Sequence, residues 1–530
     1  MGDRPAATKS TRSVVRSKNG MIATSQPLAA VAGLDVLMKG GNAIDAAVAA
    51  SAVLGVVEPF ATSIGGDAFA IYWDSNKKEL IGLNGSGRSA SKIDAEELKR
   101  KKGFEKLPLT GVHTITVPGA VDAWDVMLSK YGTMGFDELL KPAIHYAREG
   151  FPVSEIIAQQ WKMSIGALET DEAKRVFLID GKPPQAGDIF KNPDLANSLE
   201  LIAQKGRDVF YNGELTDVMC TTMSELGGAL SAEDFKNHKS DWIVPISTDY
   251  KGYAVYELPP NGQGAMVLEM LNILEGYDLK ALGHNTADYM HLIIEAKKAA
   301  FADRGKYIAD PSFAKLPIEH IISKDYAAER RKRIDMNRAS LMEDWDWKSS
   351  NTVYLSVADK FGNVISFITS CYWEFASGIV PKGTGIVMQN RGTLFSLEKG
   401  HFNYLEPNKR PLHTIIPAFV MKDGKPWFSF GVMGGDMQPQ GHVQVLLNII
   451  EFGMNVQEAG EAARVCHTSE GIAVEANIPW QERLKLIEKG HFLISAFDVS
   501  GGYQGIMIDP ETGAFAGGSD DRKDGCAIGY

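Results

Sequence analysis

A threonine at the junction of a loop and a strand is the first residue whose type and position allow chemistry. Thr352 follows the charged, irregular stretch LMEDWDWKSSN and opens the alternating run TVYLSVAD. A threonine in such a place is usually structural, because β-branched side chains favour strands. Its hydroxyl becomes a good nucleophile only when a base lies beside it. The position therefore allows two interpretations, a strand residue or a catalytic nucleophile.

A pair of glycines forms the second candidate. In GVMGGDMQPQGHVQV a predicted strand ends at Gly434 and Gly435, and a helix begins within a few residues. Glycines at such a junction let backbone N–H groups point at a ligand, and the N-terminus of the helix favours negative charge. This is the geometry that stabilises an oxyanion. The alternative is a tight strand-to-helix turn without a catalytic role.

Five other polar residues have ordinary structural explanations. Asp67 follows two glycines and either lines a pocket or belongs to a turn or a helix cap. His291 and Glu295 are spaced by one helical turn but lack further ligands, so no metal site is predicted. His442 and His467 are interpreted as packed or solvated side chains.

The elements that must position these residues change character along the chain. Two helices joined at KGGNA are predicted over residues 28–56, followed by a hairpin of AFAIYWD and ELIGLNG. Residues 110–330 are mainly helical, with clear patterns in FDELLKPAIHYAREG, AMVLEMLNILEGY and NTADYMHLIIEAKKAAFADRG, the last capped at Asn285 or Thr286. A loop is predicted over residues 341–351, and then come two hairpins, TVYLSVAD with VISFIT and IIPAFVMKDGKPWFSFGV. Helices return at GHVQVLLNIIEFG and NVQEAGEAARV. Paired strands between helical stretches predict an α+β fold with sheets between helical layers.

The bulk properties exclude several classes of protein. The chain has 530 residues, enough for two or three domains, yet it contains no repeat and no linker that would separate them. A net charge of -11 argues against general affinity for nucleic acid or anionic membrane. The four cysteines are widely spaced, which favours free thiols in a reducing compartment. The N-terminus has no signal-like apolar stretch and no membrane-spanning run is present, so a cytoplasmic location is expected.

The two candidate positions and their surroundings resemble γ-glutamyltransferases, a family of N-terminal nucleophile hydrolases. SNTVYLSVADKFGNVIS is similar to the segment that opens the small subunit of that family. Six further segments are similar to family segments in family order: QPLAAVAGLDVLMKGGNAIDAAVAASAVLGVVEP, YGTMGFDELLKPAIHYAREGF, PPNGQGAMVLEMLNILEGYDL, EAKKAAFADRGKYIADP, PNKRPLHTIIPA and GVMGGDMQPQGH.

The resemblance implies a four-layer αββα sandwich and a self-cleaving enzyme without a cofactor. Thr352 matches the residue that attacks the carbonyl of Asn351, which would divide the chain into 1–351 and 352–530, packed as one intertwined unit. The freed amine of Thr352 would then serve as the base. Gly434 and Gly435 match the oxyanion hole, and Ser370 matches a hydroxyl that orients the new N-terminus. The expected partners are a small-molecule amide and the two cleaved pieces, as a heterodimer or a dimer of heterodimers.

The sequence departs from the family where the substrate is held. Tyr372 replaces an asparagine, Thr393 stands for an aspartate that binds the substrate ammonium, and His413 and Thr414 replace paired serines. Arg88 is displaced by about two positions from the family's carboxylate-binding arginine, and we expect it to bind the carboxylate of the substrate. SLEKGHFNYLEPNKRP is too short for the lid loop of many members.

Three functions remain open at this point. The first is hydrolysis of γ-glutamyl amides such as glutathione. The second is hydrolysis of another small acid amide, such as oxamate, by the same machinery. The third is an inactive binding scaffold, which the presence of Thr352, Ser370 and the glycine pair disfavours.

Overall fold

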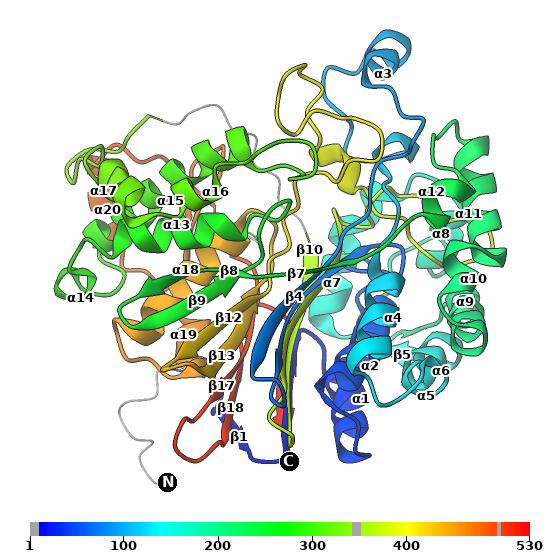
Figure 1. Ribbon diagram of the computed structural model, residues 1–530, viewed down its shortest axis with the longest axis horizontal. Coiled ribbons are helices and arrows are strands. Elements are labelled where there is room, and N and C mark those ends of the chain that lie inside the picture. Colours follow the sequence, from blue (N-terminus) through cyan, green and yellow to red (C-terminus); the bar gives the residue numbers. More distant parts are fainter. Residues whose placement is uncertain (1–9, 342–350, 496–499) are drawn as a thin grey trace.

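Two antiparallel sheets of seven strands face each other in the middle of the molecule, and helices cover the outer face of each (Figure 1). The computed structural model describes residues 10–341, 351–495 and 500–530. The architecture is the four-layer αββα sandwich that the family resemblance implies.

Both sheets contain strands from before and after Thr352. The order in the first sheet is β1 (Val15–Ser17), β18 (Phe515–Ser519), β17 (Tyr503–Ile508), β13 (Lys425–Val432), β12 (Ala418–Lys422), β9 (Tyr253–Glu257) and β8 (Ile246–Tyr250). The order in the second sheet is β19 (Cys526–Gly529), β2 (Gly20–Thr24), β10 (Asn351–Asp359), β11 (Val364–Tyr372), β3 (Asp67–Asp74), β4 (Glu79–Gly85) and β7 (Asp241–Ile243). Segments 1–351 and 352–530 thus share both sheets; cleavage between them stays a prediction.

The outer face of the second sheet packs against an Ala-rich helix, α2 (Ala43–Val57), all of whose residues are buried. Its small side chains allow the helix to approach the sheet closely, and Asn42 and Asp45 cap its first turn. Further helices complete this layer (Figure 1): α1 (Pro27–Met38), α4 (Ala120–Tyr131), α5 (Phe136–Leu139), α6 (Lys141–Glu149), α7 (Glu155–Ser164), α8 (Asp171–Phe177), α9 (Pro193–Lys205), α10 (Asp208–Tyr211), α11 (Glu214–Glu225) and α12 (Ala232–Lys236). The single helix predicted at residues 136–149 is two, because the chain turns at Leu140.

The outer face of the first sheet packs against α13 (Gly264–Leu274) and α18 (Met437–Ile450), and α15 (Ala287–Tyr307) packs on α13. Thr286 caps α15 by accepting the Tyr289 N–H, which confirms one of the two predicted caps. Smaller elements flank this layer: α14 (Leu279–Leu282), α16 (Ile318–Ile321), α17 (Lys324–Arg331), α19 (Val456–Glu461), α20 (Trp480–Glu488), β14 (Val465–His467), β15 (Ile472–Val474) and β16 (Leu493–Ile494).

Strands β10 and β11 are buried along their whole length and have packed side chains on both faces. Val353 and Leu355 of β10 pack toward the helices, whereas Tyr354 lies between the sheets among side chains such as Phe419 and Ile506. Alternation along the strand therefore directs the even-numbered residues of β10 toward the first sheet. Of the loop predicted over residues 341–351, residues 342–350 lie outside the described part of the chain, and Asn351 is the first residue of β10.

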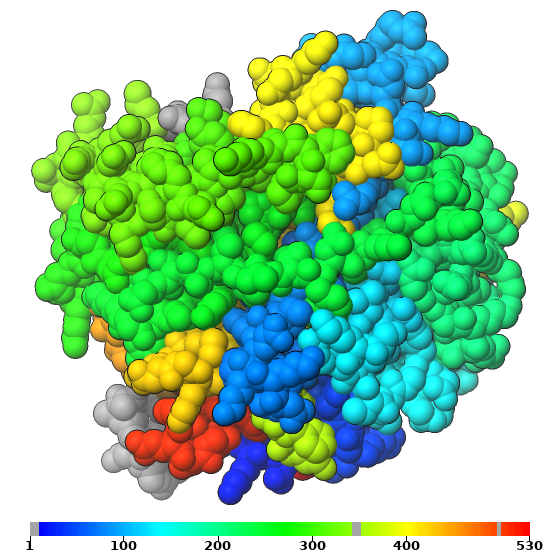
Figure 2. All heavy atoms as spheres, viewed as in Figure 1, coloured from blue at the N-terminus to red at the C-terminus, as the bar shows by residue number. Residues whose placement is uncertain are grey.

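A small projection rises above the sandwich. Helix α3 (Ala95–Lys102) packs its buried Leu98 against a segment near residues 395–405 through Phe395 and Leu405. Figure 2 shows these two parts of the chain side by side at the top of the molecule. Within the described ranges, no helix combines the length and the apolar character needed to cross a membrane.

Candidate functional site

The Asn351–Thr352 peptide bond lies at the start of a strand whose pairing is irregular. Asn351 pairs with Tyr372 and Val353 pairs with Thr369, so β11 carries one more residue than β10 at this point. Such a bulge changes the direction of the side chains next to it. It brings the hydroxyl of Ser370 to both the bond and the nucleophile.

Ser370 makes the most informative contacts in the site. Its Oγ donates to the Asn351 carbonyl oxygen at 2.9 Å and accepts the Tyr372 N–H at 2.8 Å. Thr352 Oγ1 lies 3.4 Å from the same atom. A hydroxyl has one donor and two acceptor positions, and this arrangement uses all of them. Ser370 therefore polarises the carbonyl that Thr352 would attack, and it also orients Thr352.

The glycine pair forms the turn between β13 and α18. Gly434 and Gly435 adopt φ of 106° and 58°, which side chains disfavour. Gln438, in the first turn of α18, places its Nε2 3.5 Å from Thr352 Oγ1 and accepts the Ile416 N–H with its Oε1. The first turn of α18 thus lies near the nucleophile, and the N-terminus of a helix favours negative charge.

A buried polar network holds this turn in place. Gln263 Nε2 donates to the carbonyls of Gly435 and Thr414, at 3.0 and 2.7 Å. Arg304 donates to Gln263 Oε1 at 2.7 Å and forms an ion pair with Asp436, the residue before α18. These supporting residues were not named from the sequence, although the segments that contain them were part of the family resemblance.

Asp67 belongs to the site region and is more than a turn residue. Its Oδ1 accepts N–H groups from Gly87, Gly119 and Gln389, at 2.9 to 3.1 Å. Burial raises the pKa of Asp67 to about 7, against the lowering effects of nearby Arg391 and these hydrogen bonds. Asp67 Oδ2 lies 3.1 Å from His413 Nε2.

His413 is fully engaged by its neighbours. Its Nδ1 accepts the Ile415 N–H, so Nε2 carries the proton and donates to Asp67. Burial keeps the pKa of His413 well below its usual value, so the ring is neutral. The structure places His413 behind the site, and its predicted contact with substrate stays a prediction.

Tyr372 and Thr414 contact a buried arginine, Arg391, that was not singled out from the sequence. Arg391 donates to Thr414 Oγ1 at 2.7 Å, and its Cζ lies 4.7 Å from the centre of the Tyr372 ring. Thr393 is two residues further along and its hydroxyl points to the Leu107 carbonyl. Tyr372 has φ of 83°, a strained backbone of the kind that concentrates at functional sites.

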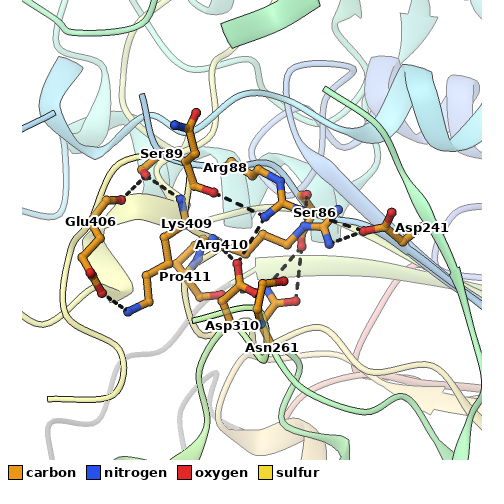
Figure 3. A network of polar contacts seen from close by, with 12 residues as sticks. Ser86, Arg88, Ser89, Asp241, Asn261, Asp310, Glu406, Lys409, Arg410 and Pro411 are labelled. Atoms are coloured by element: carbon orange, nitrogen blue, oxygen red, sulfur yellow. Dashed lines mark hydrogen bonds and ion pairs between the residues drawn. The ribbon is translucent and has the colours of Figure 1, made fainter. Parts of the chain in front are cut away.

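Arg88 has carboxylate partners of its own (Figure 3). Its guanidinium lies 3.3 Å from Asp310 and 3.9 Å from Asp241, and it donates to the Asn408 carbonyl. Arg410 contacts the same Asp241 and donates to the Ser86 carbonyl. About a third of the Arg88 side chain is exposed. These contacts tie residues 86–89 to the 406–411 segment, and the expected grip on substrate stays untested.

The structure adds a third residue to the His291–Glu295 pair. His491 Nε2 lies 2.8 Å from His291 Nδ1, and atoms of all three residues lie within 4.8 Å of one another. Glu295 is already paired with Lys298 at 2.8 Å, and His291 Nε2 contacts the Asp335 carbonyl. The group is thus held by its own hydrogen bonds and charges.

His442 is buried against Glu257, in keeping with a packed side chain.

We expect Ser370→Ala to slow self-cleavage by about 10²- to 10³-fold, because the scissile carbonyl loses its donor. The measurement is the time course of conversion of the full chain into two fragments on a denaturing gel. Ser377→Ala is the matched control, since Ser377 is an equally buried serine that donates to the Met388 carbonyl. Cleavage of the Ser370 variant at the wild-type rate would show that this hydroxyl only supports the strand.

Comparisons with known proteins agree with this geometry. The family model described as gamma-glutamyltranspeptidase matches residues 29–530. The chain is 39% identical to the glutathione hydrolase-like YwrD proenzyme of Bacillus subtilis, covering 98% of this chain and 99% of that protein. It is 34% identical to the glutathione hydrolase proenzyme of Escherichia coli, over 97% and 93% of the two chains. A solved structure described as cephalosporin acylase from Bacillus halodurans superposes with a TM-score of 0.93 and 43% identity, covering 100% of this chain and 99% of that one.

Proposed function

Because the chain belongs to the gamma-glutamyltranspeptidase family, we propose that it is a self-cleaving amidohydrolase whose nucleophile is Thr352. Its substrates are small acid amides, γ-glutamyl amides such as glutathione among them. The observation that carries the assignment is the Ser370 hydroxyl, which donates to the Asn351 carbonyl and lies beside Thr352 Oγ1.

Self-cleavage begins with attack of Thr352 Oγ1 on the carbonyl carbon of Asn351. The hydroxyl proton passes to the leaving nitrogen, the C–N bond breaks, and an ester joins Asn351 to Thr352. This shift frees the amine of Thr352, and water then hydrolyses the ester, which gives the Asn351 carboxylate and restores the Thr352 hydroxyl. The precursor thereby creates its own base, since an α-amine has a pKa of about 8 in its unperturbed state.

The same atoms support turnover of an amide. The amine of Thr352 accepts the proton of its own hydroxyl while Oγ1 attacks the substrate carbonyl. The backbone N–H groups at Gly434 and Gly435 would stabilise the oxyanion, aided by the N-terminus of α18. Collapse gives an acyl-threonine, the leaving amine takes the proton, and water hydrolyses the acyl group.

The two carboxylates near the site, Asp67 and Asp436, are already paired within the protein and are not free to bind a substrate ammonium group. This favours acyl groups that lack an amino group and supports the second candidate function. Thr393 stands where the family has an ammonium-binding aspartate. Asp67 is engaged by its N–H donors and His413, and Asp436 is paired with Arg304. Loss of a charged hydrogen bond to an ammonium costs roughly 1.5–3 kcal/mol, a factor of about ten to a hundred in binding. Similarity to a protein described as a cephalosporin acylase supports the same interpretation.

We expect slow hydrolysis of γ-glutamyl-p-nitroanilide and little penalty when the α-amino group is absent, as in glutaryl-p-nitroanilide. Hydrolysis should exceed transfer to glycylglycine, because a site without a lid gives water easy access to the acyl-enzyme. The measurement is the release of p-nitroaniline from both compounds, with and without the dipeptide. A strong preference for the γ-glutamyl compound, or marked stimulation by glycylglycine, would contradict the open, ammonium-independent site.

We also propose that fragments 1–351 and 352–530 stay together after cleavage as a heterodimer. Support comes from the two sheets, each of which contains strands of both fragments. A reducing, cytoplasmic setting is part of the same proposal, supported by four cysteines that are all free.

A further inference from the structure

Arg391 is a buried cation with an incomplete set of hydrogen bonds. Its side chain has no exposed surface, and it belongs to the short 3₁₀ turn Arg391–Leu394. Nη1 donates to Thr414 Oγ1 at 2.7 Å. Nε and Nη2 have no hydrogen-bond partner among the described residues. Buried charges in proteins are normally paired and hydrogen-bonded, so the free edge of this guanidinium requires an explanation.

The contacts of Arg391 link it to the surroundings of the nucleophile through two residues. On one side it lies over the ring of Tyr372, which pairs with Asn351 at the cleavage position. On the other side it donates to the hydroxyl of Thr414. The carbonyls of Thr414 and Gly435 both accept hydrogen bonds from Gln263 Nε2. Arg391 thus contacts one residue that pairs with the scissile strand, Tyr372, and one residue linked to the glycine turn, Thr414.

Among the described residues, the charged groups around Arg391 do not occupy the Nε–Nη2 edge of its guanidinium, which is therefore available to a ligand. Asp67 is the acid that attracts it, but both oxygens of Asp67 already accept hydrogen bonds, from three N–H groups and from His413. Burial lowers the pKa of Arg391 to about 10, so it keeps its charge at neutral pH. The Nε and Nη2 atoms form one of the two edges with which arginine binds a carboxylate through two parallel hydrogen bonds.

We propose that the Nε–Nη2 edge of Arg391 binds a free carboxylate on the acyl group of the substrate. The preferred donors are then monoamides of short dicarboxylic acids, a class that includes γ-glutamyl amides. This inference rests on the proposed function, in which Thr352 carries that acyl group. It also assigns to Arg391 the role that the sequence suggested for Arg88, whose guanidinium is already paired with Asp310 and Asp241.

The test compares two anilides that differ only in the carboxylate, glutaryl-p-nitroanilide and pentanoyl-p-nitroanilide, on wild-type enzyme and Arg391→Lys. Lysine keeps the charge but loses the planar fork. We expect the wild type to prefer the glutaryl compound, and R391K to lose about ten- to a hundredfold in kcat/KM on that compound alone. The kcat/KM for the pentanoyl compound should change by less than about threefold, because this compound has no carboxylate to bind the planar guanidinium.

A matched control is Arg330→Lys on α17, an arginine paired with Asp303 whose Nε has no hydrogen-bond partner among the described atoms and lies 3.9 Å from Glu269. R330K should keep the wild-type ratio of the two rates. Self-cleavage into two chains shows that each variant has folded. If R391K does not fold, the proposal is tested by the ratio of the glutaryl rate to the pentanoyl rate in the wild-type enzyme.

The proposal is overturned if the wild type has no preference for the carboxylate, or if R391K keeps it. It is also overturned if both rates fall equally, since that would mean a structural role. Failure of the proposed function is a separate result, in which wild-type enzyme hydrolyses neither anilide.

Discussion

Replacing Thr352 with alanine is expected to leave one uncut chain with activity reduced by about 10⁴-fold or more. The substitution removes the atom that attacks the Asn351 carbonyl, and without cleavage the amine of Thr352 is never released as a base. The change is small, so the buried strand should keep its fold. The measurements are a denaturing gel, a far-UV spectrum and the rate of p-nitroaniline release.

Thr352→Ser is the control for this result. Serine keeps the hydroxyl, so this variant should still divide into two chains and retain part of the activity. Cleavage of the alanine variant at the same bond would mean that another group attacks it. A variant that fails to fold would point to a structural role for the threonine in β10.

The second large effect is expected at the glycine turn. Gly434 has φ of 106°, and a Cβ there would lie 3.2 Å from the Cα of Gly501 and 3.3 Å from the Cβ of Met437. Gly434→Ala should therefore strain the turn and displace the N–H groups that we propose face the oxyanion. Loss of one such donor lowers kcat by about 10²- to 10³-fold, and we expect a fall of this size with KM nearly unchanged.

Gly453→Ala separates this effect from backbone strain alone. Gly453 has φ of 66° and no atom within 4 Å of an added Cβ, and it follows the C-terminal end of α18. It should lose stability by about 1–3 kcal/mol while kcat stays at the wild-type value. If Gly434→Ala melts at a lower temperature but keeps its kcat, the turn contributes to folding and is not the oxyanion site.

Local patterns in the sequence predicted the elements that carry the nucleophile. The alternating runs on either side of the KFGN turn are β10 and β11, and the Ala-rich segment after KGGNA is α2. These assignments succeed because β-branched and aromatic residues favour strands, alanine favours helices, and glycine-containing turns mark where each element ends. The glycine pair between β13 and α18 was found for a similar reason, since a change from strand to helix within a few residues needs glycine.

Long-range pairing and isolated polar residues could not be predicted in the same way. The C-terminal strand β19 joins the second sheet beside β2, a contact between residues about 500 positions apart that no local pattern encodes. The bulge that directs Ser370 to the Asn351 carbonyl depends on the register of two strands. Arg391 has no periodic neighbours, and only burial and a missing partner mark it as unusual.

The residues expected to hold the substrate show what alignment with a family leaves open. Arg88 lies close in sequence to the position of a carboxylate-binding arginine, yet its contacts are with Asp310 and Asp241. His413 aligns with a substrate-contacting position, yet both of its ring nitrogens are used within the fold. Alignment identifies the backbone position, whereas the direction of a side chain depends on the partners that surround it.

The most direct test of the central claim is the intact mass of wild-type enzyme quenched with acid during turnover of glutaryl-p-nitroanilide. The account predicts two chains, 1–351 and 352–530, with a fraction of the second chain heavier by one glutaryl group attached at Thr352. A single active chain, a cut at another bond, or an acyl group on a residue other than Thr352 would contradict it.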